Sequence, residues 1–167
     1  MHHELPDRFS IIEVPGDGHC IFYSWEIALN VSSTSGFKPK YTSLLDLARI
    51  EFLTNQDHYK PFFTETTVNY GDEIDKTLVD KDYGNGIADM MANALSNSTK
   101  TTAVIWQKEN DQLVQRNIIN PAFGANPVNG VIHLLRDGQH YEPIVERHHK
   151  GICEILKTLN PFRASCF

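Results

Sequence analysis

The sequence predicts one domain that contains both helices and strands, with most helices before the strands. Apolar residues after the glycine turn at 16–18 recur at helical spacing, and AlaValIleTrp at 103–106 is typical of a buried strand. An Asp-Gly pair between the apolar runs of 131–145 indicates a hairpin. With 167 residues the chain can bury a core of its own, so it requires neither disulfides nor a structural metal.

Two helices are expected in the first third of the chain. The first covers 20–31, where apolar side chains follow the i, i+3, i+4 pattern, and SerSerThrSerGly at 32–36 ends it. The second lies around 44–52, with Ser43 and Asp46 as its capping pair.

The middle of the chain gives weaker signals. Within 58–82 the pattern favours helical turns at 72–80 over strands, and GlyAsnGly at 84–86 is a stop signal. A further helix is expected at 87–95, because apolar residues again recur at helical spacing there and lead into the buried strand.

The remaining strands follow in order. Residues 112–119 fit a strand, and 120–130 contain too many Pro, Gly and Asn residues for anything but a loop. The runs 131–135 and 140–145 form the two strands of the hairpin, and the last helix is expected at about 151–159.

Charge and composition exclude several classes of partner. Asp and Glu number 21 against 15 Lys and Arg, for a net charge of -6, so the chain lacks the positive field that nucleic acids and anionic membranes select. No stretch is apolar enough to span a membrane, and the N-terminus carries no signal-peptide pattern. We therefore expect a soluble cytoplasmic protein that binds neither nucleic acid nor membrane.

The three cysteines do not form a disulfide framework. Cys20, Cys153 and Cys166 are odd in number and contain no CxxC pair, which favours a reducing compartment. Cys153 and Cys166 are interpreted as ordinary thiols, since neither follows a glycine turn. The two tryptophans, Trp25 and Trp106, lie on apolar faces and are expected in the core.

Cys20 stands where a Gly-Asp-Gly turn meets the first turn of a helix. Backbone N–H groups and the positive end of the helix dipole would favour its thiolate and could bind an oxyanion. Gly16 and Gly18 permit such a close approach. A cysteine after a glycine turn is by itself more often an ordinary half-buried residue, so the catalytic interpretation requires a base.

His140 and Glu142 supply that base and an acid. His140 begins a strand just after a tight turn, and Glu142 shares its face because strand side chains alternate. The carboxylate can orient the imidazole and fix its tautomer. Taken singly, the alternative for each is a solvated hairpin side chain.

Three motifs in this order resemble the ovarian tumour (OTU) cysteine proteases over about residues 9–146. ValProGlyAspGlyHisCysIlePheTyrSer at 14–24 is similar to the family's Gly-Asp-Gly-x-Cys signature. The segment from Tyr83, through the helix, to the strand at 103–106 resembles its Trp-Gly-Gly turn, helix and core strand. AspGlyGlnHisTyrGluProIleVal at 137–145 resembles its histidine strand.

The resemblance implies a papain-like α+β fold over the single domain 1–167, with a small mixed or antiparallel sheet flanked by helices. It implies hydrolysis of the bond after the C-terminal glycine of ubiquitin or a ubiquitin-like modifier. Cys20 would be the nucleophile and His140 the general base, with Glu142 where the family most often has Asp or Asn. Some relatives take the acid from before the cysteine loop, and Asp7 is the candidate for that alternative.

The same resemblance assigns the loop and the channel. Asp17 would hold the oxyanion loop, and Tyr83 and Asn85 depart from the family's Trp and middle Gly. The oxyanion hole would be lined by the N–H groups of Gly18, His19 and Cys20. The narrow channel for a Gly-Gly tail would be walled by Gly16, Gly84, Asn85, Gly86, Gly138, Gln139 and Tyr141.

The implied enzyme is a monomer with no metal or cofactor, and its partner is ubiquitin or polyubiquitin. In a virus or a secreted effector its location would be the host cytosol. A zinc site is disfavoured, because adjacent histidines on a strand point apart and no third or fourth ligand has the right spacing. The histidine and cysteine candidates for such a site are His2, His3, His148, His149 and Cys153.

Two other functions share these residues. An OTU-fold domain could bind ubiquitin without cleaving it, and the Glu at position 142 keeps that alternative open. A cysteine protease that cleaves its own polyprotein would use the same catalytic residues on a different substrate.

Overall fold

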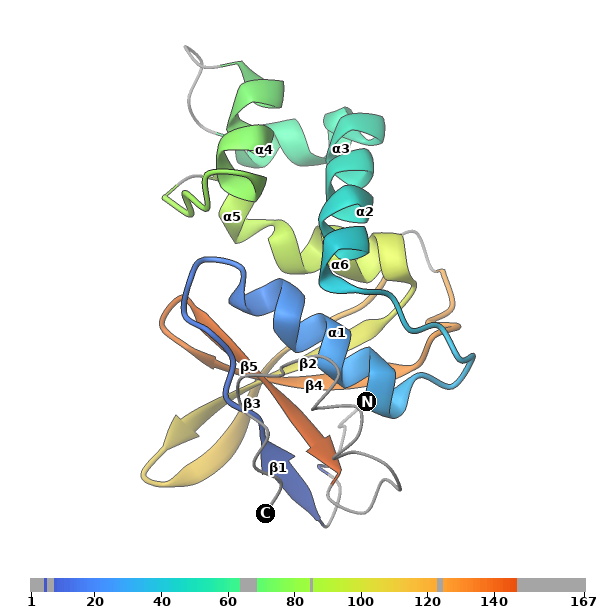
Figure 1. The fold of residues 1–167 in the computed structure, drawn as a ribbon, viewed down its shortest axis with the longest axis vertical. Helices are drawn as coiled ribbons and strands as arrows, with labels where there is room; N and C mark the ends of the chain where they lie inside the picture. The colour runs from blue at the N-terminus through green and yellow to red at the C-terminus, as the bar shows by residue number, and fades with distance from the viewer. Residues whose placement is uncertain (1–4, 6–7, 64–68, 85, 123–124, 147–167) are drawn as a thin grey trace.

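The computed structural model describes residues 5, 8–63, 69–84, 86–122 and 125–146. Figure 1 shows a sheet with helix α1 lying across one face and the other helices stacked beyond α1 and along the sheet's edge. The strands are β1 (Phe9–Ile11), β2 (Thr102–Glu109), β3 (Gln112–Ile119), β4 (Val131–Asp137) and β5 (His140–Glu146). The helices are α1 (Cys20–Ser32), α2 (Tyr41–Thr54), α3 (Gln56–Tyr59), η1 (Lys60–Phe62), α4 (Tyr70–Leu78), α5 (Gly86–Asp89) and α6 (Met91–Thr99).

The sheet is mixed, with the strand order β1-β5-β4-β2-β3. Strands β2 and β4 are parallel at its centre, and the other three pairs are antiparallel. The α+β class expected from the sequence is therefore confirmed, and both strands of the predicted hairpin pair as expected. The sequence did not reveal β1, because a three-residue strand is too short to show alternation.

The hairpin between β4 and β5 is a tight two-residue turn. Asp137 pairs with His140, which leaves Gly138 and Gln139 as the turn residues. Gly138 has a φ of 59°, which other residues rarely adopt and which a turn with glycine in first place requires. The turn fixes His140 as the first residue of β5.

Helix α1 confirms the predicted helix at 20–31, but α2 corrects the predicted capping pair. Helix α2 begins at Tyr41, with Lys40 as its N-cap and no side-chain cap, so Ser43 and Asp46 lie inside the helix. Its first turn is instead held by α1, because the Glu26 carboxylate accepts a hydrogen bond from the Tyr41 N–H.

The region predicted as one helix at 87–95 forms two. Helix α5 ends at Asp89, and α6 begins at Met91 after Met90 adopts a φ of -95° and a ψ of 1°. The N–H of Met90 donates to the carbonyl of Ile87, which closes a tighter turn than an α-helix allows. The helical turns expected at 72–80 correspond to α4, which is capped by Asn69 through the N–H of Asp72.

The largest core cluster lies between the sheet and the helices, and a smaller one covers the opposite face of the sheet. Trp25 is fully buried in the first and donates its indole N–H to the Thr99 hydroxyl, while Trp106 is buried in the second. Both tryptophans therefore lie in the core, as expected. The Ser24 hydroxyl donates to the Tyr141 carbonyl, which holds the N-terminal half of α1 beside β5.

Some expectations concern residues outside the described part of the chain. These are the helix at 151–159, the thiols of Cys153 and Cys166, and the histidines considered for zinc. Among the described residues, no helix is long and apolar enough to cross a membrane.

Candidate active site

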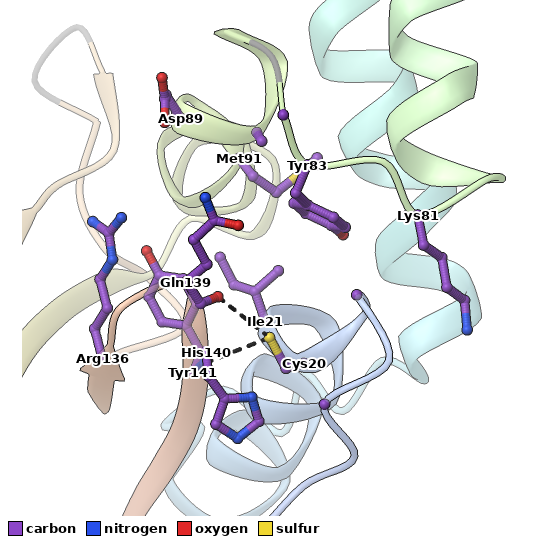
Figure 2. A pocket seen from close by; sticks show the side chains of 14 residues that line it. Cys20, Ile21, Lys81, Tyr83, Asp89, Met91, Arg136, Gln139, His140 and Tyr141 are labelled. Carbon is purple, nitrogen blue, oxygen red and sulfur yellow. Dashed lines mark hydrogen bonds between the residues drawn. The ribbon is translucent and has the colours of Figure 1, made fainter.

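A cavity of about 550 Å³ opens at the N-terminus of α1. Figure 2 shows that its lining comes from the loop before α1 with the first turn of α1, from the β4–β5 hairpin, and from the segment that leads from α4 to the first residue of α6. Fourteen residues line it: Gly16, Gly18, Cys20, Ile21, Lys81, Tyr83, Gly84, Ala88, Asp89, Met91, Arg136, Gln139, His140 and Tyr141. Three segments that are distant in sequence therefore meet around one thiol.

Cys20 is the first residue of α1 and is 6% exposed. Its Sγ donates to the Gln139 carbonyl at 3.7 Å and accepts from the Tyr141 N–H at 3.4 Å, as drawn in Figure 2. Burial raises the pKa of the thiol above its ordinary value, although the N–H groups of Tyr141, Ile21 and Cys20 itself oppose that shift. The site favours the neutral thiol, which corrects the expectation that the helix N-terminus would favour the thiolate.

Asp17 holds the loop that precedes Cys20. Its Oδ1 accepts the N–H of His19 at 3.0 Å, and its Oδ2 accepts the Tyr23 hydroxyl at 2.9 Å and the Lys81 Nζ at 3.2 Å. Burial raises the pKa of the carboxyl, but the hydrogen bonds and the Lys81 charge outweigh it and leave the pKa lowered. A charged Asp17 thus joins the loop to α1 and to the segment after α4.

His19 is buried at 7% exposure and forms a second link to α4. Its Nε2–H donates to the carbonyl of Leu78 at 2.8 Å, and its ring packs edge-on against Phe22 and Tyr23. Burial lowers the pKa of the imidazole, and its polar neighbours do not reverse that shift. His19 is therefore a neutral side chain that anchors the loop.

The amides predicted for the oxyanion hole are not equally available. The N–H of His19 is already engaged by Asp17, whereas Gly18 and Cys20 line the cavity. Gly18 has a φ of +90°, and a Cβ added there would lie 2.7 Å from the Lys81 Cβ. The loop can make this close approach only because position 18 is glycine.

His140 lies on the other side of the thiol. Its imidazole is adjacent to Gly16, where an added Cβ would be 3.8 Å from its Nδ1. His140 and Glu142 share one face of β5, opposite Asp137 and Leu135 of β4. Within residues 8–63 and 69–146 as far as the structure describes them, no hydrogen bond joins the imidazole to Cys20 or to Glu142. Asp7 lies outside the described residues.

The predicted channel residues divide into three groups. Those that line the cavity are Gly16, Gly84, Gln139 and Tyr141. Gly86 and Gly138 are not part of the lining, and Gly86 is instead required for packing, because a Cβ there would lie 2.7 Å from the Phe62 carbonyl oxygen. Asn85 lies outside the described residues.

Sequence reasoning missed several lining side chains. Arg136 is held beside the hairpin, where its Nε donates to the Gly138 carbonyl and its guanidinium lies 5.6 Å from the Tyr141 ring centroid. Lys81 and Asp89 reach the cavity from the segment between α4 and α6. The sequence patterns assign no role to Lys81, Asp89 or Arg136 themselves, so only the folded chain brings these charges to the thiol. In the described part of the chain, no group of three or more metal-ligating side chains occurs.

Solved structures identify the fold. An OTU deubiquitinase from Wolbachia pipientis wMel bound to ubiquitin superposes with a TM-score of 0.61 at 16% identity, covering 85% of this chain and 98% of that chain. The chain has an OTU fold. The OTU domain of OTUD1 matches with a TM-score of 0.61 at 13% identity over 83% of this chain and 86% of that chain.

Viral proteins share the OTU fold as well. The Hazara virus OTU bound to ubiquitin matches with a TM-score of 0.54 at 20% identity, covering 84% of this chain and 82% of that chain. No protein-family model matches the sequence, and no curated protein matches it by sequence. The similarity to known OTU domains is thus visible in the fold and in the short motifs.

Proposed function

We propose that this protein is a cysteine-type deubiquitinase that cleaves the bond after the C-terminal glycine of ubiquitin or of a ubiquitin-like modifier. One observation carries the proposal: Cys20 begins α1 and, together with His140, lines a cavity in a chain with an OTU fold. Two of the matched OTU structures are described as bound to ubiquitin, which supports ubiquitin as the substrate class.

His140 acts as the general base in the proposed mechanism. Because burial raises the pKa of Cys20, the thiol must lose its proton to a neighbouring base before it attacks. His140 accepts that proton, and Sγ then adds to the scissile carbonyl carbon. The tetrahedral intermediate collapses to a thioester as the imidazolium protonates the leaving lysine amine, and water hydrolyses the thioester.

Glu142 is the proposed third member of the triad. It shares a strand face with His140, which places the carboxylate and the imidazole on the same side of β5. A hydrogen bond between them would fix the tautomer in which the other imidazole nitrogen faces Cys20. Asp7 remains the alternative acid.

The channel for the substrate tail runs past residues that take little space. Gly16, Gly18 and Gly84 line the cavity and leave room for an extended Gly-Gly segment next to Cys20. In the proposed mechanism the enzyme acts as a monomer and uses no metal or cofactor. Acidic and basic side chains at the rim, Asp89 and Arg136, would contact the residues that precede the glycines.

The first test is labelling with ubiquitin that carries a thiol-reactive group at its C-terminus. We expect the wild-type protein to gain the mass of one ubiquitin and Cys20→Ala to gain none. Cys153→Ala serves as the matched control, because it removes a thiol to which no role is assigned. Labelling of Cys20→Ala, or no labelling of the wild type by ubiquitin or ubiquitin-like probes, would contradict the proposal.

A module that binds ubiquitin without cleaving it is the second candidate. It is favoured by the raised pKa of Cys20 and by the absence, among the described residues, of a hydrogen bond from His140 to the thiol. Titration of fluorescent ubiquitin against wild-type protein and Cys20→Ala distinguishes the two. Saturable binding by both, without hydrolysis of diubiquitin by the wild type, would support the module.

A further inference from the structure

The carboxylate of Asp17 connects the loop before α1 to the first turn of that helix. Its Oδ1 accepts the N–H of His19, two residues further on, and its Oδ2 accepts the hydroxyl of Tyr23 at 2.9 Å. In the sequence, Asp17 and Tyr23 lie on either side of Cys20, the residue at which α1 begins. One carboxylate therefore ties the loop to the helix across the nucleophile.

The contact at Oδ1 fixes the backbone around Gly18. An aspartate oxygen that accepts the N–H two residues further on closes a tight turn, and Gly18 stands in the middle of this turn with a φ of 90°. Gly18 and Cys20 both line the cavity. A rotation of the turn would therefore move their amides relative to a carbonyl bound there.

Tyr23 is well placed to hold the second oxygen. Its ring packs edge-on against the Tyr41 ring, with centroids 4.9 Å apart, and against the His19 ring at 6.4 Å. Burial raises the pKa of the phenol, and the hydrogen bond to Asp17 raises it further, so the hydroxyl keeps its proton. Tyr23 is thus a lasting donor to a charged carboxylate, and hydrogen bonds of that class are the stronger ones.

Lys81 is the other donor to Oδ2, at 3.2 Å. Its side chain is 37% exposed and that of Asp17 is 39% exposed, so water weakens this ion pair. The lysine charge also sits on a flexible four-carbon stem, whereas the Tyr23 hydroxyl is carried by a rigid ring on α1. The contact with Tyr23 therefore contributes more to the orientation of the carboxylate.

We propose that Tyr23 is a positioning residue for the oxyanion hole, an inference that rests on the function proposed above. Its hydroxyl orients the Asp17 carboxylate, and Asp17 in turn fixes the backbone at Gly18. The turn then presents the amides of Gly18 and Cys20 to the oxygen of the tetrahedral intermediate. Tyr23 is not among the described residues that line the cavity, so it acts through Asp17.

Tyr23→Phe tests the assignment, because it removes one oxygen atom and leaves the ring packed against Tyr41. With ubiquitin C-terminal 7-amido-4-methylcoumarin as substrate, we expect kcat to fall about tenfold while KM changes less than about twofold. Alkylation of Cys20 by iodoacetamide forms no oxyanion, and the thiol is held by the β4–β5 hairpin, so the alkylation rate should stay the same. A melting temperature measured alongside reports whether the variant is folded.

A double-mutant comparison with Asp17→Ala tests whether Tyr23 acts through this carboxylate. In the Asp17→Ala background, Tyr23→Phe should change kcat less than about twofold, because the hydrogen bond is absent from both proteins. Tyr41→Phe is the matched control, since it removes the same atom from the neighbouring ring, which makes no hydrogen bond to Asp17 among the described residues. It should leave kcat unchanged.

Three results would overturn the role of Tyr23. They are equal kcat for Tyr23→Phe and wild type, an equal loss of hydrolysis and of alkylation, and a tenfold loss that persists in the Asp17→Ala background. If the wild-type protein itself does not hydrolyse the substrate, the proposed function fails instead, so the two failures are distinguishable.

Discussion

The loop before α1 and the start of β5 face each other across Cys20, but they are held in different ways. Side-chain hydrogen bonds of Asp17 and His19 join the loop to Tyr23, Lys81 and the end of α4. On the opposite side, His140 is positioned by the β4–β5 ladder, and no side-chain hydrogen bond of its imidazole occurs among the described residues.

This difference indicates which part of the site is preorganised before substrate binds. The nucleophile and its glycine turn are fixed before any substrate binds, because several strong contacts determine one loop conformation. The imidazole has no such side-chain hydrogen bond among the described residues, so its contact with the thiol is expected to form when the site is occupied. Substitutions on the two sides should therefore fail in different ways.

The largest expected effect is on the side of the base. His140→Asn should lower kcat/KM for a ubiquitin substrate by about 1,000-fold or more, because among the residues that the structure describes no other imidazole lines the cavity with the buried thiol. Steady-state hydrolysis measures the loss, and His58→Asn in α3 is the control. Full activity of His140→Asn would show that a different residue is the base, and it would contradict the proposed difference between the loop before α1 and the start of β5.

On the loop side, Asp17→Ala removes three hydrogen bonds at once. We expect kcat/KM to fall by about 100-fold, since small displacements of a catalytic group have effects of that size. Asp57→Ala, an exposed acid in α3, should have no effect. If Asp17→Ala keeps its activity, the loop does not depend on these contacts.

The lowered pKa of Asp17 also gives a direction for pH dependence. A group with a lowered folded-state pKa stabilises the protein above its ordinary value of 3.8, and that contribution is lost as the pH falls through the folded-state pKa. The hydrogen bonds of Asp17 should therefore persist to a lower pH than they would if its carboxyl kept the ordinary pKa of 3.8. Because the side chain is partly exposed, the effect on unfolding free energy is small.

A smaller effect is expected for the third triad position. Glu142→Gln should reduce kcat by about tenfold with little change in KM, because the carboxylate acts by orienting His140 and no hydrogen bond joins the two side chains among the described residues. Glu146→Gln at the exposed end of the same strand is the matched control. An effect below about twofold would move the acid to another residue, such as Asp7.

The smallest effect concerns stability behind the loop, where Glu26 joins α1 to the start of α2. Burial raises the pKa of this carboxyl to about 7 from 4.5, opposed by the Tyr41 N–H and by Lys40. The unfolded chain therefore binds fewer protons than the folded one between those values, and the stability contributed by this group falls as the pH rises through that window.

Glu26→Gln removes the charge and keeps an acceptor for the Tyr41 N–H. We expect it to raise the unfolding free energy by about 1–2 kcal/mol at about pH 8 and to change it little at about pH 5. Urea unfolding at the two pH values measures this. Equal effects at both would show that Glu26 does not titrate in that range.

Much of the architecture could be predicted from the sequence, because it depends on local signals. Apolar periodicity placed α1, and Asp137 and Gly138 placed the hairpin, since a turn of that composition permits few backbone conformations. The predicted start of α2 was wrong because the first N–H of the helix is satisfied by Glu26 of another helix. The spacing of residues within one segment cannot predict such a contact.

The candidate site also combines features that local sequence patterns predict with features that depend on the folded chain. Cys20 and His140 could be selected from the sequence, because a glycine turn at a helix start and a histidine after a hairpin are local patterns. The protonation state of the thiol could not be predicted, because its pKa depends on how deeply the folded chain buries it.

The sequence by itself determined where the helices, the hairpin and the reactive side chains lie along the chain. Only the tertiary structure decided that Lys81, Tyr83 and Arg136 join the cavity, and that Asp17 takes the amide of His19. The physical reason is that these are contacts between segments far apart in the sequence, and such contacts form only when burial of a shared core brings the segments together.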